Sequence, residues 1–442
     1  MTVTVGRTGI APRENGAPPP RVPISDVHLE SLEFWDQSED MRDGCFAALR
    51  REAPVSFWAT PEFPGFEAGA GHWALTTHED VHFASRHPQI FSSEPTSTSL
   101  MDVAPEIAEF LGSMISIDDP RHLRLRTIVN RAFTPKVLAR IESSVRDQAR
   151  GLVNAMIAAH PDGQCDFVAE LAAPLPLAII CDMMGIPEED RAKVFHWTTV
   201  LLGVGDDEVS VQHDELVAVT TDLATYGLQL AESRRETPGD DLTTALVHAE
   251  VDGERLSSSE IASFFILLTA AGNETTRNAI SHGMVALTHF PDERQRWWAD
   301  FDGIAPTAVE EIVRWASPLN FMRRTLSEDV ELRGTKMRAG DKVSLWYCSA
   351  NRDEEKFDNP WRFDVTRSPN PQFGYGGGGA HFCLGANLAR REIRLAFEEL
   401  HRHIPDLVAT DEPAILRSAF IHGIKRLPVA WTPPSGVRLP HV

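Results

Sequence analysis

The sequence Gly374-Tyr-Gly-Gly-Gly-Gly-Ala-His-Phe-Cys-Leu-Gly385 is a glycine-rich segment that contains a cysteine. Its glycines satisfy the GxGxxG pattern of dinucleotide-binding turns, but the surrounding sequence does not fit that function. Asn370-Pro371 precedes the loop where a buried strand is required, and Cys383 rather than a helix follows the last glycine. We therefore interpret the glycines as backbone that permits positive φ angles and lets a flat ligand approach closely.

Cys383 stands just ahead of a segment whose apolar residues recur at helical spacing, so we expect the thiol at a helix N-terminus. Free amides at such an end lower the pKa of a thiol and favour the thiolate, which is the form that binds a soft metal. A buried, inert cysteine is the alternative, and the loop alone leaves it open. The other four cysteines are scattered without a CxxC pair, which disfavours a disulfide scaffold and a four-thiolate zinc site.

With this loop and the motifs below, the chain resembles a cytochrome P450, a heme-thiolate monooxygenase, over nearly all of the sequence after residue 23. In that family the cysteine of the loop is the proximal iron ligand. The matching positions here are Cys383, Gly379, His381 and Gly385. One departure is that Gly376 occupies the usual aromatic position, with Tyr375 one residue before it. The resemblance implies heme b, dioxygen, and electrons that come from NADPH or NADH through separate redox proteins.

A second motif is Glu311-Ile-Val-Arg314, which places a carboxylate and a guanidinium on one face of a predicted helix. An exposed pair of this kind is common and contributes less than ~1 kcal/mol. The resemblance implies a buried role, in which the pair joins the downstream Arg362 and locks the core beneath the heme loop.

The longest predicted helix begins at the capping box Ser257-Ser-Ser-Glu260 and continues to Phe290. Ala271-Gly-Asn-Glu-Thr-Thr276 interrupts its apolar centre, and such polar groups are costly to bury unpaired. Threonines that bond back to the helix are one explanation. The resemblance implies instead an oxygen-binding groove, where Gly272 leaves room for dioxygen, Thr275 donates a hydrogen bond to it, and Glu274 feeds protons inward.

The resemblance alone assigns two further sets of residues. The heme propionates are expected at His122, Arg126 and Arg324, with a fourth contact from His381. The distal pocket is expected to be lined by Phe110, Met114, Leu267, Leu268, Ala271, Leu319, Phe321 and Phe420.

The net charge of −22 makes nucleic acid and anionic membranes poor partners. No apolar run approaches the ~20 residues that span a bilayer and no secretory signal is visible, so we expect a cytoplasmic protein without a transmembrane anchor. Basic residues nevertheless gather in two places, which are Arg121, Arg124, Arg126, Arg131, Lys136 and Arg140, and then Arg390, Arg391 and Arg394. We expect them to steer an acidic ferredoxin, itself reduced by a ferredoxin reductase, although binding propionates and capping helices would also explain some of them.

Residues 1–23 carry five prolines and no apolar periodicity, and we expect a flexible N-terminal tail. No long linker follows, so residues 24–442 are expected to form one catalytic domain. Its class is mainly α with a small β region, and the resemblance places the heme between the long central helix and the helix after the cysteine loop. Helical spacing is present at 135–159, 187–203, 211–235, 291–301, 306–317 and 384–403.

The substrate class is inferred from similarity. Strings such as FFILLTAAGNETTRNAI and FGYGGGGAHFCLGANLARREIR resemble the bacterial methyl-branched-lipid omega-hydroxylases. This implies hydroxylation of the terminal (omega) methyl of methyl-branched or isoprenoid fatty acids and alcohols. Within the family the alternative is a terminal hydroxylase of the cholesterol or cholest-4-en-3-one side chain. Glu274 and Thr275 disfavour a peroxide-driven enzyme, and also a non-catalytic heme-binding sensor, because such a sensor has no use for a proton relay.

Overall fold

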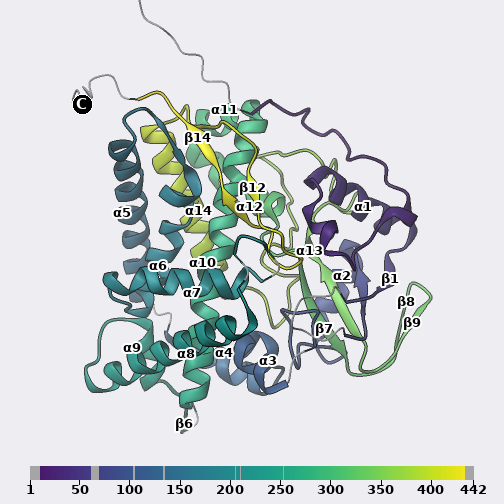
Figure 1. The fold of residues 1–442 in the computed structure, drawn as a ribbon, viewed down its shortest axis with the longest axis horizontal. Helices are drawn as coiled ribbons and strands as arrows, with labels where there is room; N and C mark the ends of the chain where they lie inside the picture. Colours follow the sequence, from purple (N-terminus) through teal and green to yellow (C-terminus); the bar gives the residue numbers. More distant parts are fainter. Residues whose placement is uncertain are drawn as a thin grey trace, which may run out of the picture.

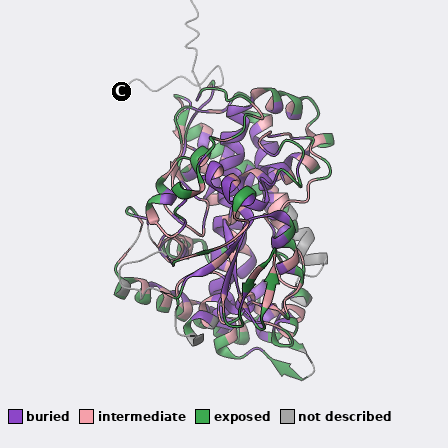
Figure 2. Ribbon diagram, turned by 90° about the vertical axis from the view of Figure 1, so that its right-hand side faces the viewer, coloured by how far each residue is buried: buried purple, intermediate pink, exposed green. Residues whose placement is uncertain are grey.

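The computed structural model describes residues 10–60, 69–102, 105–132, 135–204, 206–209, 211–251 and 253–433. A large body of helices surrounds one long central helix, and a smaller region at the right of Figure 1 holds the main sheet with α1 and α2. The expected mainly α fold with a small β region is confirmed. Buried residues fill the interior of both regions (Figure 2). No helix within the described residues is long and apolar enough to cross a membrane.

The central helix α10 runs from Ser258 to His289 and spans about 48 Å at 1.5 Å per residue. It begins at the predicted capping box, in which Ser257 Oγ accepts the N–H of Glu260 and the Glu260 carboxylate accepts the N–H of Ser257. Most of its residues are buried. The other elements therefore pack around this helix.

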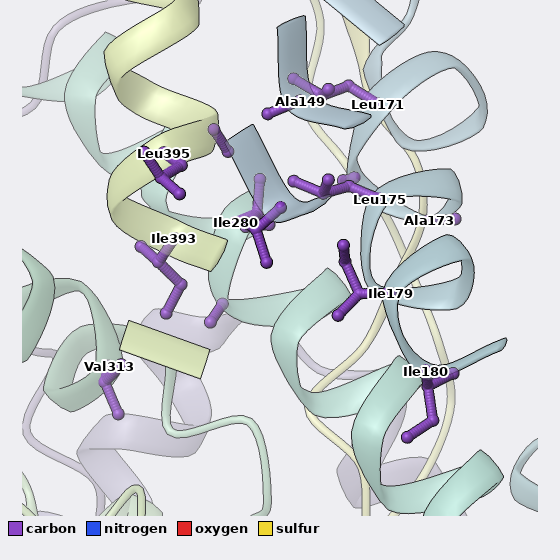
Figure 3. Close-up of a cluster of buried hydrophobic side chains, with 14 of the residues drawn as sticks. Ala149, Leu171, Ala173, Leu175, Ile179, Ile180, Ile280, Val313, Ile393 and Leu395 are labelled. Carbon is purple, nitrogen blue, oxygen red and sulfur yellow. The ribbon is translucent and has the colours of Figure 1, made fainter. Parts of the chain in front are cut away.

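Helices α5, α6, α8, α12 and α14 pack directly on α10 or on one another. Their bounds are α5 Pro135–Ala159, α6 Pro174–Met184, α8 His213–Glu236, α12 Phe301–Ala316 and α14 Ala386–His403. Figure 3 shows Ile280 of α10 among side chains of α14, such as Ile393, and of α6, such as Leu175. The apolar spacing predicts α5, α8 and α14 closely but not α6, which is apolar on nearly all sides and shows no clear helical period.

The remaining helices are shorter. They are α1 Glu39–Glu52, α2 His78–Arg86, α3 Pro105–Gly112, α4 Arg121–Ala132, α7 Arg191–Leu202, α9 Leu242–His248, α11 Pro291–Ala299 and α13 Tyr347–Ala350. A 3₁₀ turn at Ser113–Ser116 follows α3.

The main sheet has the strand order β1-β2-β10-β7-β3. Its strands are β1 Val55–Trp58, β2 His72–Leu75, β10 Lys342–Trp346, β7 Phe321–Leu326 and β3 Phe91–Ser92, and only the β10–β2 pair is parallel. A three-stranded sheet joins β11 Val408–Ala409, β14 Pro428–Ala430 and β4 Gln164–Asp166. Three hairpin-like pairs are β5 Glu250–Val251 with β6 Glu254–Arg255, β8 Val330–Leu332 with β9 Thr335–Met337, and β12 Ala414–Ile415 with β13 Ile424–Arg426.

The described part of the expected tail packs on this body. The side chain of Ile10 is buried, and its N–H donates to the Ala409 carbonyl at 2.9 Å. Asn15 exchanges two hydrogen bonds with the backbone of Phe363. Residues 10–23 therefore contact the catalytic body at several points, residues 1–9 lie outside the described residues, and the flexibility of the tail stays a prediction. The prolines remove helical and strand periodicity from this segment, but they do not prevent an extended chain from binding to a surface.

Candidate active site

The cysteine loop is held in shape by its own backbone. The N–H of Cys383 donates to the Tyr375 carbonyl at 3.0 Å. Positive φ angles of +91°, +86° and +79° occur at Gly376, Gly378 and Gly379. A Cβ atom at Gly379 would lie 2.4 Å from the carbonyl oxygen of Ser85, so both conformation and space require glycine there. The expected positive φ angles are confirmed.

The Cys383 side chain is exposed among the described residues. Loss of water around it raises the pKa of the Cys383 thiol, although the amides of Gly385 and Ala386 and the charges of Arg126 and Arg390 act against this shift. The expected lowering is therefore wrong for the free thiol, because desolvation outweighs the helix terminus. Coordination by a metal removes a thiol proton outright, and the same amides and cations then stabilise the anion.

Two buried basic residues beside the loop, His122 and Arg324, fit the carboxylates of a heme. The rings of His122 and His381 lie 4.3 Å apart, and Nε2 of the buried His122 has no partner among the described residues. Arg324 is also buried, donates to the Arg323 carbonyl at 2.7 Å, and forms no ion pair with a described acid. Desolvation lowers the pKa of this guanidinium. Because such groups are costly to bury without an anion, a pair of propionates would satisfy both.

The other expected heme contacts lie differently. Arg126 donates from Nη1 and Nη2 to the carbonyls of Ala380 and Phe382 at 2.8 and 2.7 Å, so it holds the loop just ahead of the cysteine. His381 Nε2 lies 3.0 Å from Ser93 Oγ. A Cβ atom at Gly385 would meet no protein atom within 4 Å, so its expected contact with a heme stays a prediction.

The pair predicted on α12 is a fully buried ion pair. Arg314 donates to both carboxylate oxygens of Glu311 at 2.7 Å, and its Nη1 also reaches the carbonyls of Asn351 and Pro360 at 2.9 Å. The side chain that completes the network is Arg367, whose Nε lies 3.1 and 3.2 Å from the Glu311 oxygens.

Arg362 was the predicted third member, and that assignment is wrong. Its half-exposed guanidinium lies 3.5 Å from Glu293, and only its backbone carbonyl enters the network, accepting from Arg314 and Arg367. The turn after Phe363 points Arg367 back toward α12. The surrounding donors lower the pKa of the Glu311 carboxyl although burial opposes them.

A cavity of about 310 Å³ lies along α10. Five predicted residues line it, namely Leu267, Ala271, Leu319, Phe321 and Phe420. Three do not line it, because Phe110 and Leu268 pack against the main hydrophobic core and Met114 is buried within it. Residues 266, 267, 270, 271, 274 and 275 of α10 form the stripe of the helix that lines the cavity, and position 268 falls outside it.

Gly272 does not line the cavity, which corrects its predicted role. A Cβ atom at this position would lie 3.1 Å from Cδ1 of Ile180, so Gly272 allows α10 to pack closely on α6. Of the two neighbours, Ala271 is the one that lines the cavity. The sequence motif cannot distinguish these two residues, because the rotation of α10 about its own axis decides which of them faces the cavity.

Glu274 and Thr275 both line the cavity, as predicted. The buried Glu274 accepts a hydrogen bond from Arg277 Nη1 at 2.7 Å, and Arg277 Nη2 donates to the Ile424 carbonyl. Desolvation raises the pKa of the Glu274 carboxyl against the opposing charge of Arg277. Thr275 Oγ1 donates to the Ala271 carbonyl at 2.9 Å, which is the back-bonding that the sequence left open.

Several cavity residues escape the sequence analysis because they come from segments without a motif. They include Thr96, Thr98, Leu100 and Met101 after β3, Leu201, Val204 and Leu216 around the α7–α8 connection, and Ile421 after the predicted Phe420. Most of them are apolar like any core residue, and the two threonines belong to no motif, so no signal in one sequence separates them.

Three residues of the expected basic face are paired with acids of the same chain. Arg124 pairs with Glu254 and Glu260 at 2.9 Å, Arg390 pairs with Glu310, and Arg394 pairs with Asp302. The side chains of Arg131, Lys136 and Arg140 lie outside those that the structure describes.

The buried Glu–Arg network, the cysteine loop and the acid–threonine pair on the central helix together define a heme-thiolate monooxygenase. The chain belongs to the cytochrome P450 family. The family model described as Cytochrome P450 matches residues 212–403. It is 67% identical over 425 residues to the Mycobacterium bovis "Methyl-branched lipid omega-hydroxylase", covering 96% of this chain and 99% of the relative. The M. bovis "Steroid C26-monooxygenase" is 38% identical over 436 residues and 96% of both chains.

A solved structure is similar over nearly the same length. It is a Mycobacterium marinum cytochrome P450 in complex with pseudoionone, with a TM-score of 0.86 and 42% identity over 93% of this chain and 99% of the other. Membership of the family means that the enzyme uses a thiolate-ligated heme b and dioxygen, and that separate redox partners supply its electrons.

Proposed function

We propose that this enzyme hydroxylates the terminal methyl of methyl-branched or isoprenoid fatty acids and alcohols. The observation that carries the proposal is the lining of the 310 Å³ cavity, where Glu274 is the only acidic or basic residue among the described side chains. Most of the others are Leu, Ile, Met, Phe or Ala. Such a lining favours the burial of a long apolar chain.

The position of the Glu274 carboxyl indicates which end of the substrate lies beside Thr275. Glu274 is next to Thr275, and no described cation lines the cavity to neutralise a second carboxylate. A substrate carboxylate at this end would be desolvated and would face another acid, which is costly. The apolar end of the chain is therefore favoured beside Thr275, and the acid or alcohol end is favoured at the other end of the cavity.

The relatives support the same substrate class. The 67% identical relative is named for methyl-branched lipids, and the 38% identical one for steroid C26 oxidation. A sterol side chain also ends in branched methyl groups, so the steroid reaction remains the second candidate. A terminal C–H bond is stronger than its internal neighbours, and the enzyme must hold the chain end-on to prevent the easier reaction.

The described residues divide the catalytic work. The heme, when bound through Cys383, supplies the activation of dioxygen. Thr275 offers a hydroxyl in the cavity that can exchange its bond to the Ala271 carbonyl for one to oxygen. Glu274 retains a proton to higher pH than an exposed carboxyl does, and Arg277 fixes its position. Together they form a short route by which protons reach the cavity.

A spectroscopic titration of the ferric protein tests the substrate class. The Soret band is followed while a methyl-branched fatty acid, its straight-chain analogue or cholest-4-en-3-one is added. The strongest high-spin shift is expected with the branched acid. A shift with the steroid alone would favour oxidation of a sterol side chain. Absence of a Soret band would show that no heme is bound and would contradict the proposal.

The variant Thr275→Ala tests the proton route. Loss of the hydroxyl is expected to uncouple the reaction, so that NADPH is consumed with formation of hydrogen peroxide and little product. Thr269→Ala is the matched control, because Thr269 lies on the same helix, bonds back to Phe265 and Ile266, and does not line the cavity. Unchanged product yield per NADPH in Thr275→Ala would count against the assigned role.

We infer that the electron donor is a small iron–sulfur ferredoxin, reduced by a ferredoxin reductase with NADPH or NADH in the cytoplasm. Support comes from the cationic start of α14, where Arg390 and Arg391 follow the cysteine loop. Arg391 is chosen as the probe because its replacement leaves the Arg390–Glu310 pair beside it in place. Arg391→Glu should slow first-electron reduction by ferredoxin, whereas Arg51→Glu on α1 should not. Equal rates would contradict docking at this face.

A further inference from the structure

Three side chains that are far apart in the sequence converge outside the heme and substrate sites. Glu39 is the first residue of α1, His282 lies in α10, and His422 lies just before β13. Oε1 of Glu39 lies 3.0 Å from Nε2 of His422 and 3.6 Å from Nδ1 of His282. The two imidazole rings are 4.1 Å apart. All three ligand atoms therefore lie within 4.8 Å of one another.

The other nitrogen of each ring determines where its lone pair lies. Nε2 of His282 is 3.2 Å from the His422 carbonyl, and Nδ1 of His422 is 2.6 Å from the Ala316 carbonyl. A carbonyl only accepts, so both of these nitrogens carry hydrogens. In the neutral rings the lone pairs are then on Nδ1 of His282 and Nε2 of His422, and both face Glu39. This is the arrangement of metal-binding histidines, whose second nitrogen donates to a backbone carbonyl.

Two lone pairs and a carboxylate repel one another unless a positive charge lies between them. Either Nε2 of His422 donates a hydrogen bond to Glu39, or a bound cation lies between the three ligand atoms and removes the repulsion.

The distances suit a small tetrahedral cation. Bonds of about 2.0–2.1 Å from nitrogen and oxygen to Zn²⁺ give ligand–ligand edges of about 3.3 Å in a tetrahedron. The two measured edges of 3.0 and 3.6 Å lie on either side of that value. A cavity of about 40 Å³ borders Glu39 and His422 and has room for a water as the fourth ligand. Arg42 and Arg352 border it too, and the carboxylate of Asp43 offsets part of their charge.

We propose that Glu39, His282 and His422 form a binding site for a divalent transition cation, best suited to Zn²⁺. Two imidazoles and one carboxylate are an established zinc donor set. The site would fasten α1 to the central helix and to the C-terminal loop. Phe420 and Ile421 line the substrate cavity directly ahead of His422, so an occupied site would also fix that wall. This inference does not depend on the proposed substrate.

Elemental analysis of the heme-loaded enzyme tests the site. The protein is incubated with ZnCl₂, dialysed against metal-free buffer, and its zinc and iron are measured per chain by mass spectrometry. Wild type is expected to retain one zinc, and its thermal midpoint is expected to rise with zinc. His422→Ala and Glu39→Gln should bind zinc more than about tenfold more weakly and should show no such rise.

A matched control is His160→Ala, which removes a histidine that also faces a carboxylate, Glu170 at 3.2 Å, but has no second histidine beside it. This variant should retain zinc as wild type does. The iron content reports whether each variant is folded, and Glu39→Gln, which is nearly isosteric, decides the question if His422→Ala loses its heme. The proposal is overturned if wild type retains no zinc, or if Glu39→Gln and His422→Ala retain as much as wild type.

Discussion

The enzyme uses the same pair of residues at the same spacing in two buried places, with opposite electrostatic results. Glu311 and Arg314 on α12, like Glu274 and Arg277 on α10, are a carboxylate and a guanidinium three residues apart on one helix. The pKa of Glu311 is lowered, and the pKa of Glu274 is raised. Sequence spacing alone cannot produce this difference.

The number of donors explains it. Glu311 accepts from Arg314, Arg367, the side chain of Asn370 and the N–H of Asp364. Glu274 accepts only from Arg277 among the hydrogen bonds of the described residues. Desolvation is similar for two buried carboxyls, so the extra donors decide which protonation state is stable. The first pair is built to stay charged and rigid, and the second to hold a proton beside the cavity.

The largest effect is expected for Glu311→Gln, which leaves Arg314 and Arg367 buried without a counter-charge. We expect a loss of about 3 kcal/mol in the free energy of unfolding and a lower heme content. Denaturant unfolding and Soret absorbance per chain measure both. Asp302→Asn is the control on the same helix, because Asp302 forms an exposed pair with Arg394 that contributes little. Equal stability of the two variants would contradict the stabilising role of the buried Glu311–Arg314 network.

A second comparison separates the two candidate arginines of the network. Arg367→Ala removes a buried partner of Glu311 and should destabilise the protein by about 3 kcal/mol. Arg362→Ala removes a half-exposed pair with Glu293 and should cost less than ~1 kcal/mol. Unfolding curves of the two variants, measured side by side, would show the reverse order if Arg362 were the structural member.

Glu274→Gln should leave the fold intact and impair the reaction. Removal of a positioned proton donor is expected to lower the rate of product formation by about 10²-fold. The measurement is product formed per NADPH consumed, compared with wild type. Asp190→Asn, in which the altered carboxyl lies outside the cavity and is bonded to Tyr226, serves as the control. Full activity in Glu274→Gln would show that proton delivery does not need the Glu274 carboxyl.

The smallest effect is the pH dependence of stability, and its sign differs between the two sites. Glu274 binds its proton more tightly in the folded state, so its contribution to stability falls as the pH rises from 4.5 through the raised pKa. Glu311 binds its proton less tightly when folded, so its contribution is lost as the pH falls below 4.5.

Denaturant unfolding over a pH series measures these contributions as differences between wild type and each glutamine variant. Relative to wild type, Glu274→Gln should gain stability with rising pH. The loss of stability caused by Glu311→Gln should become smaller as the pH falls. Each unit of pKa shift corresponds to about 1.4 kcal/mol. Slopes of the same sign for the two variants would contradict the difference between the sites.

Motifs whose geometry is local could be predicted from the sequence. The cysteine loop, the capping box of α10 and the Glu311–Arg314 pair depend on neighbours within a few residues, and all three are found as expected. Assignments that depend on how distant segments meet were less reliable. Arg362 and Arg367 are five residues apart, and only the turn between them decides which side chain reaches Glu311.

Helix phase and packing account for the other differences. Gly272 faces α6 and Ala271 faces the cavity, although the motif contains both. Leu268 is apolar like Leu267 but lies off the cavity stripe of α10. The cluster of Glu39, His282 and His422 has no sequence signal, since its members come from three separated segments.

The most direct test of the proposed function is the position of the hydroxyl group in the product. The enzyme, reconstituted with ferredoxin, ferredoxin reductase and NADPH, is incubated with a methyl-branched fatty acid, and the product is identified by mass spectrometry against synthetic standards. We expect the terminal alcohol as the main product, because the substrate chain is held with its apolar end beside Thr275. Hydroxylation mainly at internal carbons would contradict it.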